Sequence, residues 1–274
     1  MVCNNRIIEI NLKKLKMNNI KIDKLQIAVF DKNSKMGEAA AEFVHKKLNE
    51  AINLNDFANL ILATGASQFS FLKALKEQNI DWKKITVFHL DEYKGISDQH
   101  PASFRKYLRE RILDFVKPLK VYFIEGDAND IDAEIKRYEE LLKNHPIDVA
   151  CIGIGENGHI AFNDPPVANF NDPKWVKVVE LDKACRNQQL NEGWFPKLDD
   201  VPNQALTLTI PAIVKSKVIS CVVADERKAQ AVFNTLFGEI STDCPASILR
   251  THPDAVLFLD SGSVSKFNWK DLIK

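Results

Sequence analysis

The stretch VYFIEGDANDIDAEIKRYEELLKNHPIDVACIGI, residues 121–154, contains the pattern that decides the fold. A short apolar run at 121–124 precedes a segment of helical period at 131–142, and a second apolar run follows at 149–154. The apolar residues that share one face of the middle segment are Ile131, Ile135, Tyr138 and Leu142. Their three- and four-residue spacing is typical of an amphipathic helix. The stretch therefore predicts a strand, a helix and a second strand.

The same alternation runs through most of the chain. The predicted strands are 25–30, 60–63, 85–90, 121–124, 149–154, 205–210, 218–223 and 255–259. The predicted helices are 36–52, 67–76, one capped by Ser103, 131–142 and one through 229–236. Strands that alternate with helices favour a mostly parallel, doubly wound α/β sheet with helices on both faces. We predict one Rossmann-like domain at 25–274, preceded by an N-terminal extension at 1–24.

The composition is that of an ordinary globular protein, with 45% hydrophobic and 27% charged residues in a chain of 274. Lysine plus arginine and aspartate plus glutamate both number 37. This balance gives no electrostatic reason to expect nucleic acid or a membrane surface as a partner, and it is compatible with a homo-oligomer. No apolar run reaches the roughly 18 residues of a membrane span, and 1–24 lacks a secretory apolar region. We expect a cytoplasmic protein.

The sequence lacks the motifs that are typical of metal-dependent and nucleophilic catalysis. The five cysteines form no CxxC pair, and no HExxH or similar spacing of metal ligands occurs. No GxSxG nucleophile elbow is present either. We therefore expect neither a metal ion nor nucleophilic catalysis, and proton transfer is the chemistry that remains.

A turn of small residues, Thr64, Gly65, Ala66 and Ser67, joins the second predicted strand to a helix. A helix N-terminus presents N–H groups and the positive end of its dipole, which suits a phosphate group. The alternative is that Gly65 only makes the turn and Ser67 only caps the helix, and the turn alone does not decide between the two.

Two adjacent carboxylates, Asp91 and Glu92, follow the third predicted strand. A carboxylate at the end of a strand can move protons if burial raises its pKa toward neutrality. A solvated loop acid or a helix cap is the alternative. His89 is expected to point into the fold as a core histidine.

The segment GENGHIAFNDPP, residues 155–166, is the most informative one. Glycines let its backbone bend tightly around His159, and Asp164 follows five residues later. A carboxylate that orients a histidine is a general acid–base arrangement. We interpret the irregular stretch 163–173 as a functional loop.

Two basic residues could hold an anion. Lys228 begins a predicted helix, where a cation opposes the helix dipole unless an anion binds there. A surface lysine paired with a neighbouring acid is the alternative. Arg186, in the segment ACRNQQ, is a second candidate phosphate ligand, and a surface role is as consistent with its context.

Four segments together carry a resemblance to a known family. They are ATGAS at 63–67, LDEY at 90–93 with DQHPASF at 98–104, GIGENGHIAFNDP at 153–165, and RKA at 227–229. In this order they resemble the glucosamine-6-phosphate deaminase/isomerase family over roughly residues 25–265. Related 6-phosphogluconolactonases look like GHTASLFP where this chain has GHIAFNDP.

The resemblance implies an amino-sugar phosphate substrate that is converted with water into a ketose 6-phosphate and ammonia, without a cofactor or metal. Asp91 would move a proton between C2 and C1, and His159 would help open the sugar ring. Thr64 to Ser67 and Lys228 would hold the phosphate group.

The chain departs from the family pattern at several places. Asn157 and Asp164 stand where the pattern has Asp and Glu, so His159 would depend on Asp164 as its carboxylate. The pattern Asn-x-Arg-Phe-Phe becomes the segment 189–195, which puts a phosphate contact there in doubt. The Pro165–Pro166 pair replaces Pro-Gly. Glucosamine, galactosamine or another amino sugar therefore all remain open.

Two alternatives to a deaminase follow. A sugar-phosphate sensor would need neither the Asp91 base nor the His159 turn. An isomerase that keeps its nitrogen, or a lactonase, would share the fold but release no ammonia.

Overall fold

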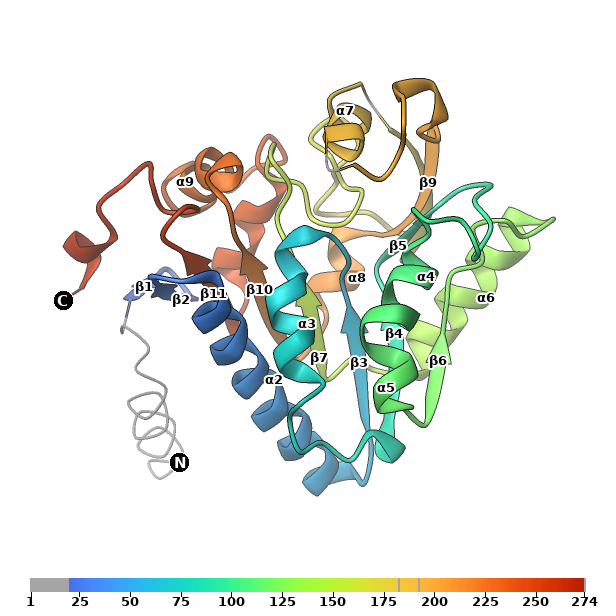
Figure 1. Cartoon of the computed structure of the whole chain (residues 1–274), viewed down its shortest axis with the longest axis horizontal. Coiled ribbons are helices and arrows are strands. Elements are labelled where there is room, and N and C mark those ends of the chain that lie inside the picture. The colour runs from blue at the N-terminus through green and yellow to red at the C-terminus, as the bar shows by residue number, and fades with distance from the viewer. Residues whose placement is uncertain (1–19, 182, 192, 274) are drawn as a thin grey trace.

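The computed structural model describes residues 20–181, 183–191 and 193–273, and its centre is an eight-stranded sheet (Figure 1). The strand order is β1-β2-β11-β10-β7-β3-β4-β6, and all neighbouring pairs except β1 and β2 are parallel. The strands are β1 (Ile20–Ile22), β2 (Leu25–Phe30), β3 (Ala58–Leu62), β4 (Ile85–His89), β6 (Lys120–Tyr122), β7 (Val149–Ile152), β10 (Val218–Val223) and β11 (Ala255–Asp260). The predicted parallel sheet is therefore confirmed.

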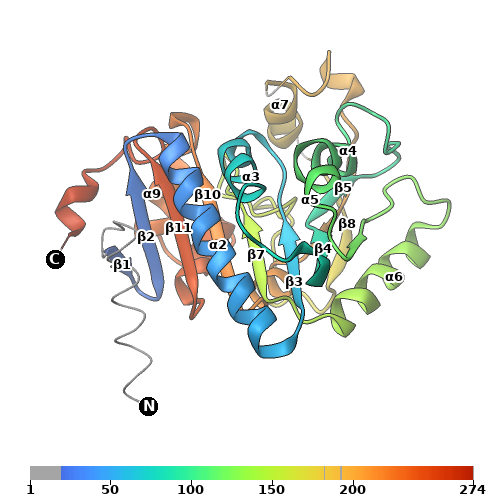
Figure 2. The ribbon, with the colours of Figure 1, turned by 60° about the horizontal axis from the view of Figure 1, so that its bottom comes forward.

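Helices cover both faces of this sheet because side chains alternate along each strand. In β3, Leu60 and Leu62 belong to the apolar core on one face, while Ile61 belongs to the core on the other. The helices of the first face, seen in front of the sheet in Figure 2, are α2 (Asn33–Asn55), α3 (Phe69–Leu75), α4 (Phe104–Leu108) and α5 (Asp114–Val116). Those of the opposite face are α6 (Ile131–Asn144), α8 (Ile210–Val214) and α9 (Ala229–Phe237). The predicted doubly wound arrangement is confirmed.

Short 3₁₀ turns and one π-helical turn join these elements. The 3₁₀ turns are η1 (Ala66–Gln68), η2 (Trp82–Lys84), η4 (Leu198–Asp200), η5 (Glu226–Lys228), η6 (Pro245–Thr251) and η7 (Trp269–Leu272). The π-helical turn is η3 (Arg109–Leu113), between α4 and α5. Ser103 caps α4 as predicted, since its side chain accepts a hydrogen bond from the backbone N–H of Lys106.

A second, antiparallel sheet in the described part of the chain was not predicted. Its strands, in the order β5-β9-β8, are β5 (Asp91–Tyr93), β9 (Gln204–Leu208) and β8 (Val176–Glu180). With α7 (Lys183–Asn191) it encloses a third apolar core around Tyr93 and Phe162. The chain enters this sheet directly after β4, so Asp91 lies where the two sheets meet.

The predicted N-terminal extension at 1–24 contains one strand that was not predicted. β1 lies within the predicted extension, and it pairs antiparallel with β2 at the edge of the sheet. Residues 1–19 of that extension lie outside the described residues. The proposed domain boundary at residue 25 remains a prediction.

The strand order places the informative segments together. Strands β10, β7, β3 and β4 are consecutive neighbours in the parallel sheet. Parallel strands end at the same edge, so the turns after these four strands meet there. These turns contain Lys228, His159, Thr64 to Ser67 and Asp91, respectively.

Candidate active site

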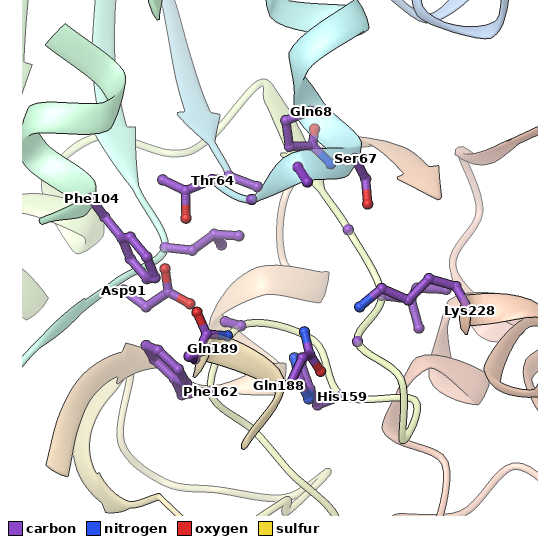
Figure 3. A pocket seen from close by; sticks show the side chains of 18 of the residues that line it. Thr64, Ser67, Gln68, Asp91, Phe104, His159, Phe162, Gln188, Gln189 and Lys228 are labelled. Atoms are coloured by element: carbon purple, nitrogen blue, oxygen red, sulfur yellow. The ribbon is translucent and has the colours of Figure 1, made fainter. Parts of the chain in front are cut away.

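A pocket opens at the carboxyl ends of these strands (Figure 3), on the side of the sheet's edge where α7 lies (Figure 1). It contains about 660 Å³ of space, part of it open to solvent. The residues that line it are 63–68, Leu90, Asp91, Phe104, 153–155, His159, Ala161, Phe162, Gln188, Gln189, Trp194 and Lys228. Of the predicted site residues, seven line this one pocket: Thr64, Gly65, Ala66, Ser67, Asp91, His159 and Lys228.

The turn after β3 forms one wall. Gly65 has a φ of +99°, a conformation that glycine adopts readily and other residues rarely. The carbonyl of Gly65 accepts a 2.8 Å hydrogen bond from the Tyr107 hydroxyl, and the Gln68 amide donates to the carbonyl of Val222 on β10 at 3.2 Å. The predicted helix at 67–76 begins as the 3₁₀ turn η1 before α3. The turn is thus held from two sides with Thr64 and Ser67 at the pocket.

Lys228 lies at the same end of the pocket as Ser67 (Figure 3). It ends η5, the 3₁₀ turn before α9, and only 5% of its surface is exposed. The side chain of Asp225 begins this turn by accepting a hydrogen bond from the backbone N–H of Arg227 at 2.9 Å. Lys228 is therefore a pocket residue and not a surface lysine.

Asp91 lies at the other end of the pocket, beside Phe104 and Phe162 (Figure 3). It is 7% exposed, and burial raises its pKa well above the ordinary value, with the nearby Glu92 charge adding to the effect. A carboxylate with a raised pKa binds a proton more readily than an ordinary aspartate. Asp91 therefore has the environment of a general base.

Glu92 has a separate, structural role. Its carboxylate accepts hydrogen bonds from the Ser103 hydroxyl at 2.8 Å and from the backbone N–H groups of Phe104 and Arg105 at 3.1 Å each. These contacts cap α4, and the Arg105 guanidinium lies 3.2 Å away. The two adjacent carboxylates point in different directions because side chains alternate along β5. The helix-cap interpretation therefore holds for Glu92, and Asp91 faces the pocket.

His89 is a core residue, as expected from its position in β4. Its ring packs edge-on against Phe123 at a centroid distance of 5.2 Å and is fully buried. Burial lowers its pKa to about 3, so the ring is neutral.

The histidine of the β7 turn contacts both predicted polar partners. Nδ1 of His159 lies 2.9 Å from Oδ1 of Asp164 and 2.8 Å from Oδ1 of Asn157. The Asn157 amide in turn donates to Asp164 at 2.7 Å. Asp164 loses solvation by burial, but the charge and hydrogen bond of His159, with further bonds from Asn157 and Cys185, hold its pKa below the ordinary value. Asp164 is thus the carboxylate that orients the ring, as predicted.

Gly155 makes room for this ring. A Cβ atom at residue 155 would lie 2.1 Å from two atoms of the His159 imidazole, closer than any real contact. Both ring-orienting residues bind Nδ1, so Nε2 is the nitrogen available for proton transfer in the pocket.

Arg186 does not lie at the pocket. Its guanidinium donates to the backbone carbonyls of Leu198 at 2.6 Å and Val201 at 3.2 Å. These bonds hold η4 against α7, which explains why the sequence carries an arginine here. The structure does not bring Arg186 to the other candidate phosphate ligands.

Of the predicted functional loop at 163–173, only the first two residues take part in the site. Asn163 is buried and donates to the carbonyls of Ile160 at 3.0 Å and Leu208 at 2.8 Å, which fixes the turn. Asp164 orients His159. None of the residues 165–173 lines the pocket.

Sequence reasoning missed the wall that α7 provides. Gln188, Gln189 and Trp194 line the pocket, although Arg186 was the residue of this segment that the sequence offered as a candidate ligand. The sequence did contain a signal for the glutamines. Gln188 and Gln189 form a polar pair where the segment 189–195 begins, and this segment replaces the family pattern Asn-x-Arg-Phe-Phe.

Within 20–181, 183–191 and 193–273, no helix is long and apolar enough to cross a membrane. No cluster of three or more histidine, cysteine or acidic side chains suited to a metal ion was found among those same residues.

Fold and pocket together define an α/β protein with a pocket, lined by a buried carboxylate and an oriented histidine, at the carboxyl edge of a parallel sheet. The chain belongs to the enzyme family described as glucosamine-6-phosphate isomerases/6-phosphogluconolactonase, whose model matches residues 31–258. It is 35% identical over 231 residues to the glucosamine-6-phosphate deaminase of Bacillus cereus (strain B4264), covering 84% of this chain and 86% of that protein. The deaminase of Bacillus thuringiensis (strain Al Hakam) matches with the same identity and coverage. The family resemblance is thereby confirmed.

Solved structures of related proteins share the fold of this chain. A monomeric glucosamine-6-phosphate deaminase superposes with a TM-score of 0.79 at 32% identity, covering 87% of this chain and 98% of that one. A 6-phosphogluconolactonase from Shewanella baltica OS155 superposes with a TM-score of 0.72 at 19% identity, covering 89% and 100%. The second likeness shows the shared fold.

Proposed function

We propose that this chain converts an amino-sugar 6-phosphate, with glucosamine 6-phosphate as the leading candidate, and water into fructose 6-phosphate and ammonia. The observation that carries the proposal is that a buried carboxylate, an oriented histidine and a turn of small residues beside a buried lysine line one pocket. The deaminases named above, with identities of 32% and 35%, support the same assignment.

The phosphate group would bind at the end of the pocket formed by Thr64 to Ser67 and Lys228. Backbone N–H groups at a helix start and a buried ammonium group are suited to a doubly charged oxyanion. This placement would extend the sugar along the pocket with its reactive carbons near Asp91.

His159 would open the sugar ring. The pyranose opens when the C1 hydroxyl loses its proton and the ring oxygen gains one, and an imidazole can carry that proton through Nε2. Asp164 and Asn157 would hold Nδ1 so that Nε2 keeps facing the pocket.

Asp91 would then move the C2 proton. It removes the proton from C2 of the open-chain sugar, and the resulting enolamine regains a proton at C1 to give a 2-imine. Water adds to C2 of the imine, and the C–N bond breaks to release ammonia and leave the ketone. The raised pKa makes Asp91 a stronger base than an ordinary carboxylate for this step.

A lactonase needs attack by water on an ester carbonyl and no base at C2. The segment GHIAFNDP at 158–165 resembles the deaminases here, and the 19% identity to the Shewanella lactonase supports only the common fold. A deaminase is therefore the better supported of the two activities, and we expect it to act in amino-sugar metabolism.

The test is ammonia release, coupled to an NADPH-linked glutamate dehydrogenase, from glucosamine 6-phosphate and galactosamine 6-phosphate. Hydrolysis of 6-phosphogluconolactone is measured in parallel. Ammonia release from one of the amino sugars supports the proposal. Lactone hydrolysis without ammonia release would overturn it.

A further inference from the structure

Gln68 lines the pocket, and the proposed reaction gives it no role. It is the last residue of η1, directly after the turn of small residues that follows β3, and Figure 3 shows it beside Ser67. Although it lines the pocket, only 1% of its surface is exposed. Its contacts within the protein therefore decide what it does.

The Gln68 amide joins the turn after β3 to the ends of two other strands. Its Nε2 donates to the carbonyl of Val222 on β10 at 3.2 Å and to the carbonyl of Ile152, the last residue of β7, at 3.5 Å. A side-chain amide carries two N–H donors, so it can make both bonds at once. The same group thus contacts the strand that leads to Lys228 and the strand that leads to His159.

The ladders of the sheet end before these turns begin. Pairing between β3 and β7 ends at Ile61 and Ala150, and pairing between β7 and β10 ends at Ile152 and Cys221. Beyond these pairs each chain runs on into its turn. The Gln68 amide binds its two acceptors at this point, so it continues the connection between the three chains past the ends of the ladders.

Gly153 leaves room for this amide. A Cβ atom at residue 153 would lie 3.2 Å from Nε2 of Gln68 and 3.5 Å from the carbonyl oxygen of Val222. The first distance is tighter than an ordinary van der Waals contact, so a methyl group here would push the amide away from its acceptors. The glycine after β7 therefore fits the amide that comes from the turn after β3.

A second contact joins the turns after β7 and β10 at the surface. Nη1 of Arg227 lies 3.6 Å from Oε1 of Glu156, and the two side chains are 45% and 37% exposed. Exposed ion pairs contribute little, because water screens the charges and long side chains lose entropy. The buried Gln68 amide is therefore the stronger of these two links.

We propose that Gln68 is a positioning residue, which holds the turn of Thr64 to Ser67 in register with the turns that carry Lys228 and His159. This inference rests on the proposed function, in which the phosphate group contacts both the turn after β3 and Lys228. A group bound from two segments is held tightly when the protein fixes the distance between them beforehand. Loss of the Gln68 amide would let the two segments shift, so binding of the phosphate group would weaken.

The experiment compares the wild type with Gln68→Met, which keeps the length of the side chain and removes the donors. Asn59→Leu is the matched control, since Asn59 is also 1% exposed and its amide donates to the carbonyl of Pro146 at 3.0 Å. It is the second residue of β3, near the end of the strand away from the pocket. Both variants lose a buried amide donor, so both should have a lower Tm than the wild type.

Binding keeps the inference separate from the reaction. Glucitol 6-phosphate has neither a carbonyl carbon nor an amino group, so it cannot be deaminated. Calorimetry should show that it and inorganic phosphate bind about five- to tenfold more weakly to Gln68→Met than to the wild type, and within about twofold to Asn59→Leu. The KM for glucosamine 6-phosphate should rise by the same factor in Gln68→Met, with kcat changed by less than about threefold.

A double-mutant cycle tests the contact itself and does not depend on Gln68→Met. Gly153→Ala should weaken binding of glucitol 6-phosphate by about two- to fivefold, because the new methyl group displaces the amide. In a Gln68→Ala background, where the amide is absent, the same change should alter the Kd by less than about 1.5-fold. A methyl group that only touched the ligand would act equally in both backgrounds, and that additive result would overturn the inference.

Three further results would also overturn it. The first is a Kd for glucitol 6-phosphate in Gln68→Met that equals the wild-type value. The second is an equal weakening in Asn59→Leu, because a loss of stability would then explain both. The third is no binding of either phosphate compound to the wild type. If binding follows the expected pattern but no amino sugar releases ammonia, the deaminase proposal fails and the positioning role of Gln68 stands.

Discussion

His159 and Asp164 are bound to each other across the turn after β7, with Nδ1 of the ring 2.9 Å from Oδ1 of the carboxylate. The chain between them turns back on itself through the buried Asn163, so two residues five positions apart in the sequence touch. The contact fixes which ring nitrogen faces the pocket. It is the relationship on which the proposed ring-opening step depends.

Asp164→Asn should therefore slow turnover while leaving phosphate binding intact. The variant loses the carboxylate that holds Nδ1 protonated, and we expect kcat to fall about 100-fold with the Kd for inorganic phosphate changed by less than about threefold. Steady-state kinetics and calorimetry check this. Asp130→Asn is the control, because Asp130 caps α6 and asparagine caps equally well. An unchanged kcat in Asp164→Asn would contradict the role of the pair.

Asn157→Asp should destabilise the protein at pH 8. The Asn157 amide donates to Asp164 at 2.7 Å, and the variant replaces this bond with two facing carboxylates. A loss of roughly 2–3 kcal/mol corresponds to a fall in Tm of about 4–10 °C. The fall should shrink as the pH is lowered, where protonation of the facing carboxylate pair relieves the repulsion. Thermal unfolding at pH 8 and at lower pH checks this, with the exposed Asn171→Asp as control. A Tm equal to that of the wild type at pH 8 would argue against the donor role of Asn157.

Lys228→Met should raise KM about 10- to 100-fold and change kcat by less than about threefold. A charge-assisted hydrogen bond to the phosphate group is made equally in the bound substrate and in the transition state, so its loss appears in KM. Inhibition by inorganic phosphate should weaken in parallel. Lys266→Met, at an exposed lysine, is the matched control. A large fall in kcat with KM unchanged would place Lys228 in the chemistry and not in phosphate binding.

Asp91→Asn should make the protein more stable than the wild type at pH 8. The pKa of Asp91 is higher in the folded state than its ordinary value of 3.8. Between these two values the folded state holds a proton that the unfolded state has lost, so stability falls as pH rises through this window. Asparagine carries no such cost, and its advantage should shrink as pH is lowered toward 4. Thermal unfolding at pH 8 and pH 5, with Asp243→Asn as control, measures this. A gain in Tm that does not depend on pH would contradict the assigned cause.

Much of the parallel sheet was predictable because its strands are buried apolar runs between helices of clear period. The bounds of β2 and β10 agree with the predicted 25–30 and 218–223. The second sheet was not predictable in the same way. β5 has three residues, and β8 lies in a stretch without an apolar run, so both form through pairing with β9.

The pocket lining was predictable where a polar residue or a glycine turn falls directly after a strand, as for Asp91, His159 and the turn at Gly65. It was not predictable where contacts join distant segments. The hydrogen bond between Gln189 and Tyr93 spans 96 residues, and nothing in the local sequence indicates it. For Arg186 the sequence left a phosphate ligand and a surface residue open. It could not show the bonds to the carbonyls of Leu198 and Val201, because these depend on how η4 folds back onto α7.

The most direct test of the account is the Asp91→Asn variant with glucosamine 6-phosphate, measured for both ammonia release and binding of glucitol 6-phosphate. We predict that turnover falls by at least about 1,000-fold, because the base at C2 is gone, while the Kd for glucitol 6-phosphate stays within about threefold of the wild-type value. Ammonia release within about tenfold of the wild-type rate, with binding intact, would contradict the assignment of Asp91 as the base.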